Sequence, residues 1–117
     1  AALPYLRYLL GETQMAAALS SQGVAAVRVP VPERLALHKL LVARLRRAGT
    51  EKSLKDLRQA AILIAAVGES QPGALEQAYG RTPVSTRSLI RKSLEAIRET
   101  LSAHPQAWDE VAGPARI

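Results

Sequence analysis

The sequence predicts a mainly helical fold that carries a small β-hairpin, an α+β arrangement. Apolar residues make up 48% of the 117 positions, which is enough to close the core of one domain. Phe is absent, Trp occurs once and Tyr three times, so the core must be built from Leu, Ala, Val and Ile, which suit packed helices. Beyond the first 30 positions, the apolar residues recur mainly at helical spacing.

Residues 1–30 are expected to form a strand or hairpin unit. The opening segment LPYLRYLL, residues 3–10, fits either a short strand or a helical turn. The stretch 24–29 alternates and is the better strand, and Gly23 can supply the turn before it. MAAAL, at 15–19, has a helical composition, but a lone strand needs a partner for its backbone groups. A strand–turn–strand unit is therefore plausible.

A first helix is predicted from Pro32 to about Arg47. Pro is favoured in the first turn of a helix, and Glu33 suits the positive end of the helix dipole. The apolar stripe repeats every four residues and is widened by one further leucine: Leu37, Leu40, Leu41 and Leu45. Gly49 ends this amphipathic helix, whose last turn is basic.

A second helix is predicted to begin near Ser53. The Ser53 hydroxyl can cap the free N–H groups while Asp56, three residues on, reaches back in a variant of the capping box. The predicted buried stripe comprises Leu54, Leu57, Ala61 and Ile64. The segment 60–67 is apolar all round, so we expect it to be largely enclosed at the centre of the fold.

Two further helices are predicted at 74–79 and at about 86–103, separated by glycine and proline breakers. The helical domain is therefore expected to span residues 31–104. Residues 105–117 are expected to form a loosely held tail, with Trp108 as its one anchor.

Composition excludes several classes of site. The absence of Cys removes disulfides and thiolate metal ligands, and two distant His residues make a poor metal site, so no metal site is expected in this chain. The longest apolar run is too short to cross a bilayer, and no basic segment precedes an apolar one at the start. We expect a cytoplasmic protein without a membrane partner.

The net charge of +6 is concentrated in two segments. Residues 31–47 and residues 81–98 each carry a net charge of +4. Basic segments attract the phosphates of nucleotides or nucleic acid, but basic surface helices also serve solubility alone. Charge by itself leaves both interpretations open.

Three charged residues are expected to converge between the first two helices. Lys39 and Arg46 are seven positions apart, which places them on one side of a helix, two turns apart. The short connection after Arg46 makes the two helices antiparallel neighbours, so Asp56 can lie near the Arg46 end. A lysine, an arginine and an aspartate would then meet on one face.

The segments VPVPERLALHKLLVARLRR and KSLKDLRQAA resemble the C-terminal half of a family of bacterial nucleotidyltransferases. In that family a strand ends in a V-P-x-P turn and leads into an A-x-H-K-L helix and then a K-D-L-x-Q-A helix. More distantly, K-x6-R followed by K-D-L is similar to motifs of abortive-infection nucleotidyltransferase toxins. The resemblance covers about residues 3–67.

The resemblance implies that this chain is the helical C-terminal part of a nucleotidyltransferase-fold protein, with residues 1–30 as a remnant of its sheet. It further implies transfer of a nucleotidyl group from a nucleoside triphosphate, with Mg²⁺ held by carboxylates in the complete protein. Lys39 would contact the triphosphate, Arg46 would support it, and Asp56 would orient either cation or a metal-bound water.

The sequence departs from the family at the catalytic carboxylates. The fold's signature is a Gly-Ser turn followed by a D-x-D/E strand, and no two carboxylates in this chain stand two positions apart. The first residue is Ala rather than Met, and we expect a chain that begins part-way through a longer product. We also expect the isolated 117-residue chain to be inactive.

Simpler structural roles compete with each functional assignment. Lys39 could be a solvated helix residue, Asp56 a helix cap, and His38, about 100° away from Lys39 around the helix, a packing residue. Two alternative functions also stand beside the nucleotidyltransferase one. The chain could be a non-catalytic basic helical module that binds nucleic acid, although few aromatics are present for stacking, or one that binds a protein partner.

Overall fold

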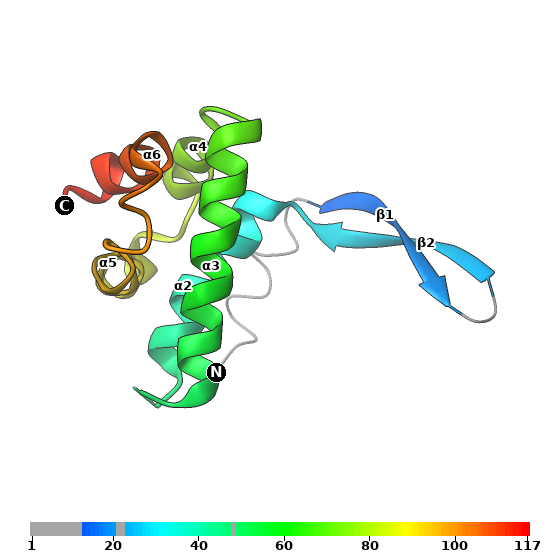
Figure 1. The fold of residues 1–117 in the computed structure, drawn as a ribbon, viewed down its shortest axis with the longest axis horizontal. Helices are drawn as coiled ribbons and strands as arrows, with labels where there is room; N and C mark the ends of the chain where they lie inside the picture. The colour runs from blue at the N-terminus through cyan, green and yellow to red at the C-terminus, as the bar shows by residue number, and fades with distance from the viewer. Residues whose placement is uncertain (1–12, 21–22, 48) are drawn as a thin grey trace.

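The computed structural model describes residues 13–20, 23–47 and 49–117, and the predicted opening segment 3–10 lies outside them. The described chain consists of an antiparallel hairpin followed by five α-helices and one short 3₁₀ turn (Figure 1). The elements are β1 (Thr13–Ser20), β2 (Gly23–Pro30), α2 (Pro32–Leu45), α3 (Glu51–Ser70), α4 (Ala74–Gly80), η1 (Val84–Thr86), α5 (Arg87–Ala96) and α6 (Pro105–Ala115). The mainly helical class predicted from the sequence is confirmed.

The hairpin pairs β1 and β2 in one continuous antiparallel register. The pairing runs from Thr13 opposite Pro30 to Ser20 opposite Gly23. The predicted strand–turn–strand unit is thus present, and the segment 15–19 is a strand despite its helical composition, because β2 supplies a partner for its backbone groups. Figure 1 shows the hairpin extending away from the helices.

Helices α2 and α3 form the antiparallel pair expected from their short connection (Figure 1). Pro32 occupies the first turn of α2, as predicted. The predicted cap of α3 is wrong, because Thr50 rather than Ser53 is the N-cap and its Oγ1 accepts the Ser53 N–H at 3.3 Å. The buried Ser53 hydroxyl instead donates to the Ala43 carbonyl of α2 at 2.9 Å, so it joins the two helices.

The buried side of α3 differs from the predicted stripe. Leu54 is 46% exposed and Ile62 is 68% exposed, so the expected burial of Leu54 and the enclosure of the segment 60–67 are wrong. The neighbours of α3 cover only part of its circumference, and an apolar composition does not reveal on which side they lie. The buried residues of α3 are Ser53, Asp56, Ala60, Ala61, Ile64, Val67 and Gly68.

The predicted helix 86–103 is divided in the structure. It begins as η1 and α5, and the helix ends at Ala96, after which turns lead to α6. Ile97 and Leu101 nevertheless remain buried in the core, which explains why the apolar spacing indicated a longer helix. The fully buried Ser93 of α5 donates its hydroxyl to the Leu40 carbonyl of α2 at 2.6 Å and joins these helices.

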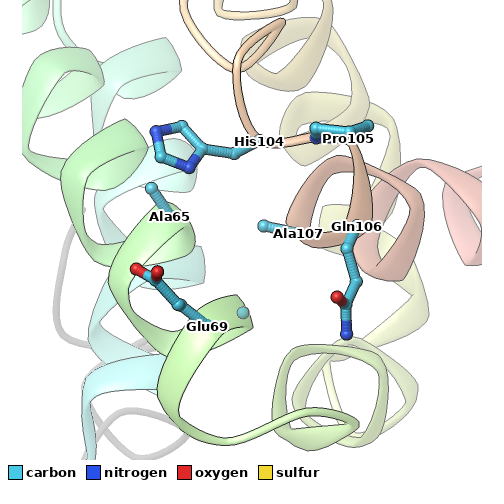
Figure 2. Close-up of a pocket in the computed structure, with 7 residues that line it drawn as sticks. Ala65, Glu69, His104, Pro105, Gln106 and Ala107 are labelled. Atoms are coloured by element: carbon cyan, nitrogen blue, oxygen red, sulfur yellow. The ribbon is translucent and has the colours of Figure 1, made fainter.

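Residues 105–117 are not a loose tail, which corrects the predicted domain boundary at 104. Pro105 begins α6, and Ala107, Val111 and Ala115 repeat every four residues on its buried side. Figure 2 shows Ala107 of α6 facing the segment of α3 that carries Ala65 and Glu69. Proline opens this helix, where its missing N–H costs nothing. The helical part therefore includes α6.

Candidate functional site

Lys39, Arg46 and Asp56 meet where the end of α2 passes the beginning of α3. Arg46 Nε donates to Asp56 Oδ2 at 2.6 Å, and Lys39 Nζ lies 3.8 Å from Asp56 Oδ1. One carboxylate therefore pairs with two cations, one at each oxygen. The structure brings together all three residues singled out in the sequence.

The local sequence explains this convergence. The separation of seven positions places Lys39 and Arg46 along one side, with Arg46 just after the last residue of α2. The Thr50 cap starts α3 at Glu51, so Asp56 lies in the second turn, too far along to cap the N-terminus. The capping role considered for Asp56 is therefore excluded by the geometry, and its carboxylate faces α2.

The three residues line a pocket of about 400 Å³. Three further side chains of α3 complete its wall: Lys52, Lys55 and Gln59. These three residues were not predicted from the sequence, although Lys52 and Gln59 lie four positions before and three after Asp56 and so share its face of a helix. Among the residues that the structure describes, four cations line the pocket together with one carboxylate, so this part of the wall has a net charge of +3.

Burial differs between the carboxylate and its two cations. The side chain of Asp56 is 11% exposed, whereas those of Lys39 and Arg46 are 25% and 41% exposed. A carboxylate so enclosed must be paired with cations. The two ion pairs in turn restrict the side chains of Lys39 and Arg46 to one region of the pocket. The cations keep access to solvent and can therefore also contact an anion in the pocket.

His38 lies beside this cluster and is half-buried. Its Nδ1 is buried and has no hydrogen-bond partner in the described part of the chain. Burial lowers the pKa of His38 below its ordinary value of 6.5, the neighbouring Lys39 lowers it further, and Asp56 opposes the shift. His38 is therefore a neutral, packed residue at neutral pH, in agreement with a structural role.

The lowered pKa predicts that His38 destabilises the fold in acid. The unfolded chain takes up a proton near pH 6.5 and the folded chain only at lower pH, so stability is lost as the pH falls through the folded-state pKa. Replacing His38→Gln should reduce the loss of stability between about pH 7.5 and about pH 5, measured by urea unfolding. His104→Gln provides the matched control, because it replaces a histidine whose side chain is exposed rather than packed inside the fold. An equal loss in wild type and His38→Gln would contradict the assignment.

A second pocket, at the crossing of α3 and α6, is a weaker candidate. It has a volume of about 250 Å³ and is lined by Glu69, His104 and Gln106 among small residues (Figure 2). No hydrogen bond or ion pair connects Glu69 with His104 in the structure as described. Across residues 13–20, 23–47 and 49–117, no group of three or more His, Asp or Glu side chains is placed to hold a metal ion.

Among the described residues, the α2–α3 pocket therefore has a basic wall around one enclosed carboxylate. Residues 1–83 match the family described as Nucleotidyltransferase. The chain belongs to this nucleotidyltransferase family, and the resemblance seen in the sequence is confirmed. No curated protein and no solved structure matches the chain. The similarity to abortive-infection toxins stays a prediction.

The described chain has no helix of the length and hydrophobicity that a bilayer span requires.

Proposed function

We propose that the α2–α3 pocket binds the triphosphate of a nucleoside triphosphate and that the chain contributes these contacts to a nucleotidyltransferase. The observation that carries the proposal is the convergence of Lys39 and Arg46 on Asp56. All three residues lie within the part of the chain that matches the family. The pocket wall keeps a net charge of +3 after Asp56 is counted, and this complements a triphosphate.

The three residues have different roles in this proposal. Lys39 provides a compact charge on a flexible stem, and Arg46 provides the remaining guanidinium N–H groups beyond the one bound to Asp56. Asp56 is a positioning residue, because it holds both cations in place before the ligand arrives and so reduces the side-chain entropy lost on binding. Lys52 and Lys55 add charge to the wall of the pocket.

The pocket does not fit Mg²⁺. Mg²⁺ requires oxygen ligands, and Asp56, the only carboxylate among the described residues that line this pocket, already pairs with a cation at each of its oxygens. The chain also contains no two carboxylates two positions apart. In our proposal the metal belongs to carboxylates outside this chain, in the complete protein. We expect the chain alone to bind triphosphate without transferring a nucleotide.

Replacing Lys39→Ala tests the proposed phosphate contact. The affinity of the 117-residue chain for inorganic tripolyphosphate should fall by about 5–150-fold, equivalent to about 1–3 kcal/mol for a charge-assisted hydrogen bond. Tripolyphosphate carries the charge shared by all nucleoside triphosphates, so the test does not depend on the base. Isothermal titration calorimetry at fixed ionic strength measures the dissociation constant.

Arg44 provides the matched control. It is an exposed cation of α2 that does not line the pocket, so Arg44→Ala removes the same charge from the same helix. This control should change the affinity by less than about twofold, since exposed charges at a distance are screened. Equal effects of the two substitutions, or unchanged affinity in a folded Lys39→Ala protein, would reduce Lys39 to a surface residue.

A further inference from the structure

A second basic pocket lies where α4, α5 and α6 meet. It has a volume of about 280 Å³. Its wall includes three arginines, Arg87, Arg91 and Arg116. Tyr79 of α4 and the last turn of α6, with Pro114 and Ala115, also line it. No residue is shared with the α2–α3 pocket. In Figure 1 the end of α6 is marked C, and it lies away from the α2–α3 connection at the lower end of α3.

Neutral acceptors fix two of these guanidinium groups. Arg87 donates from Nε to the Thr82 hydroxyl at 3.3 Å and from Nη2 to the Gly80 carbonyl at 3.2 Å, and its guanidinium lies 5.3 Å from the centre of the Tyr79 ring. Arg91 donates from Nε and Nη2 to the Ala115 carbonyl at 3.1 and 2.9 Å. Their positions are therefore set without a carboxylate that would neutralise their charge.

Arg116 adds a third cation at a position where the backbone conformation disfavours any side chain. It follows the last residue of α6 with φ 61° and ψ 47°, the left-handed conformation that usually selects Gly at a helix end. A residue with a Cβ in this conformation lowers the stability of the folded state by about 1 kcal/mol relative to Gly. This arginine is exposed, and a glycine would terminate the helix better, so the fold itself does not require a cation at this position.

The charge of the pocket favours a multivalent anion. No Asp or Glu side chain lines it among the residues that the structure describes. The C-terminal end of α6 contributes about half a negative charge, which leaves most of the charge of three arginines uncompensated. A carboxylate satisfies one guanidinium fork, whereas a phosphate group offers enough oxygens and charge for several.

We propose that Arg87, Arg91 and Arg116 form a second phosphate-binding site, distinct from the α2–α3 pocket. The three arginines lie beyond residues 1–83, which match the nucleotidyltransferase family, so the family does not account for them. The ligand is a phosphate group, carried either by a free small anion or by the backbone of a nucleic acid. The proposal does not depend on the function proposed for the α2–α3 pocket.

The Nε–H signals of the arginines in ¹H–¹⁵N NMR spectra of the 117-residue chain provide a separate readout at each site. Inorganic phosphate and a short single-stranded RNA are titrated in separate experiments, with chloride keeping the ionic strength constant. The signals of Arg87 and Arg91 should shift and saturate with at least one ligand. The Nε–H of Arg46 reports on the α2–α3 pocket, so the failure of either proposal is seen independently of the other.

Two variants complete the test. Arg116→Gly should weaken binding at this pocket roughly tenfold, the loss of one charge-assisted contact, without destabilising the fold. Lys92→Ala removes one exposed charge next to Arg91 but outside the pocket, and it should change the affinity less than about twofold.

The two ligands distinguish the source of the phosphate. Saturation by inorganic phosphate alone identifies a free anion as the ligand, and saturation by RNA at a lower concentration of phosphate groups identifies a nucleic-acid backbone. Either result supports the site. The proposal is overturned if neither ligand shifts Arg87 and Arg91 saturably, or if Arg116→Gly and Lys92→Ala weaken binding equally.

Discussion

Replacing Ile64→Ala is expected to lower the free energy of unfolding by about 2–5 kcal/mol. Ile64 is fully buried at the centre of α3, in a cluster that includes residues of every other helix. The substitution removes three carbons from a closely packed region, and the loss combines the transfer free energy of these carbons with the cost of the cavity that remains. Urea unfolding followed by circular dichroism measures the change through the transition midpoint.

Ile62 is the matched control for this substitution. It is the same residue type in the same helix, two positions away, but it is 68% exposed. Ile62→Ala should change the free energy of unfolding by less than about 0.5 kcal/mol, because little apolar surface is removed from the core and alanine has the higher helix propensity. Similar losses at the two positions would mean that α3 is covered on both sides, contrary to the structure.

Gly68→Ala is expected to destabilise the fold by about 2 kcal/mol. A Cβ at Gly68 would overlap the Cβ of Ala107 and lie 2.8 Å from its Cα, so α3 and α6 would have to move apart. Overpacking against backbone costs about 1–3 kcal/mol or more, and the helix propensity of alanine returns up to about 1 kcal/mol. The same unfolding measurement applies, and the near-ultraviolet signal of Trp108 in α6 reports the displacement locally.

Gly80→Ala should instead raise the free energy of unfolding. Gly80 is the last residue of α4, its φ is not positive, and a Cβ there meets no atom within 4 Å outside the adjoining residues. The substitution should therefore stabilise the protein by up to about 1 kcal/mol through helix propensity. Stabilisation by both glycine substitutions would show that α3 and α6 do not approach each other closely at Gly68.

The helical class and the α2–α3 pair follow from local signals in the sequence. Pro32 at a helix start and leucines at a spacing of four depend only on neighbouring residues. The side of α3 that is buried depends on α4 and α6, which lie further along the chain, and this explains the wrong prediction for Leu54. Helix α6 was missed because alanine, glycine and proline give a weak apolar periodicity, although small residues permit its close contact with Gly68.

The core of the candidate site was predicted from the sequence, whereas its periphery was not. Helical spacing placed Lys39 and Arg46 together, and a short connection brought Asp56 to them. Lys52 and Gln59 could have been added by the same spacing rule once the face of Asp56 was known. The basic pocket where α4, α5 and α6 meet could not be predicted, because it depends on the contact of the end of α6 with α5. This is a long-range contact that no local pattern encodes.

The buried hydroxyls of Ser53 and Ser93 hold α2 against rotation about its own axis. Ser53 of α3 donates to the Ala43 carbonyl, and Ser93 of α5 donates to the Leu40 carbonyl. Two separate helices are thus hydrogen-bonded to the backbone of α2. A turn of α2 by even a fraction of a residue would break one or both bonds inside the core, where an unpaired hydroxyl costs about 1–3 kcal/mol. The direction in which Lys39 leaves the helix is thereby determined by residues that never touch the pocket, and Ser93 among them belongs to the part of the chain beyond the family match.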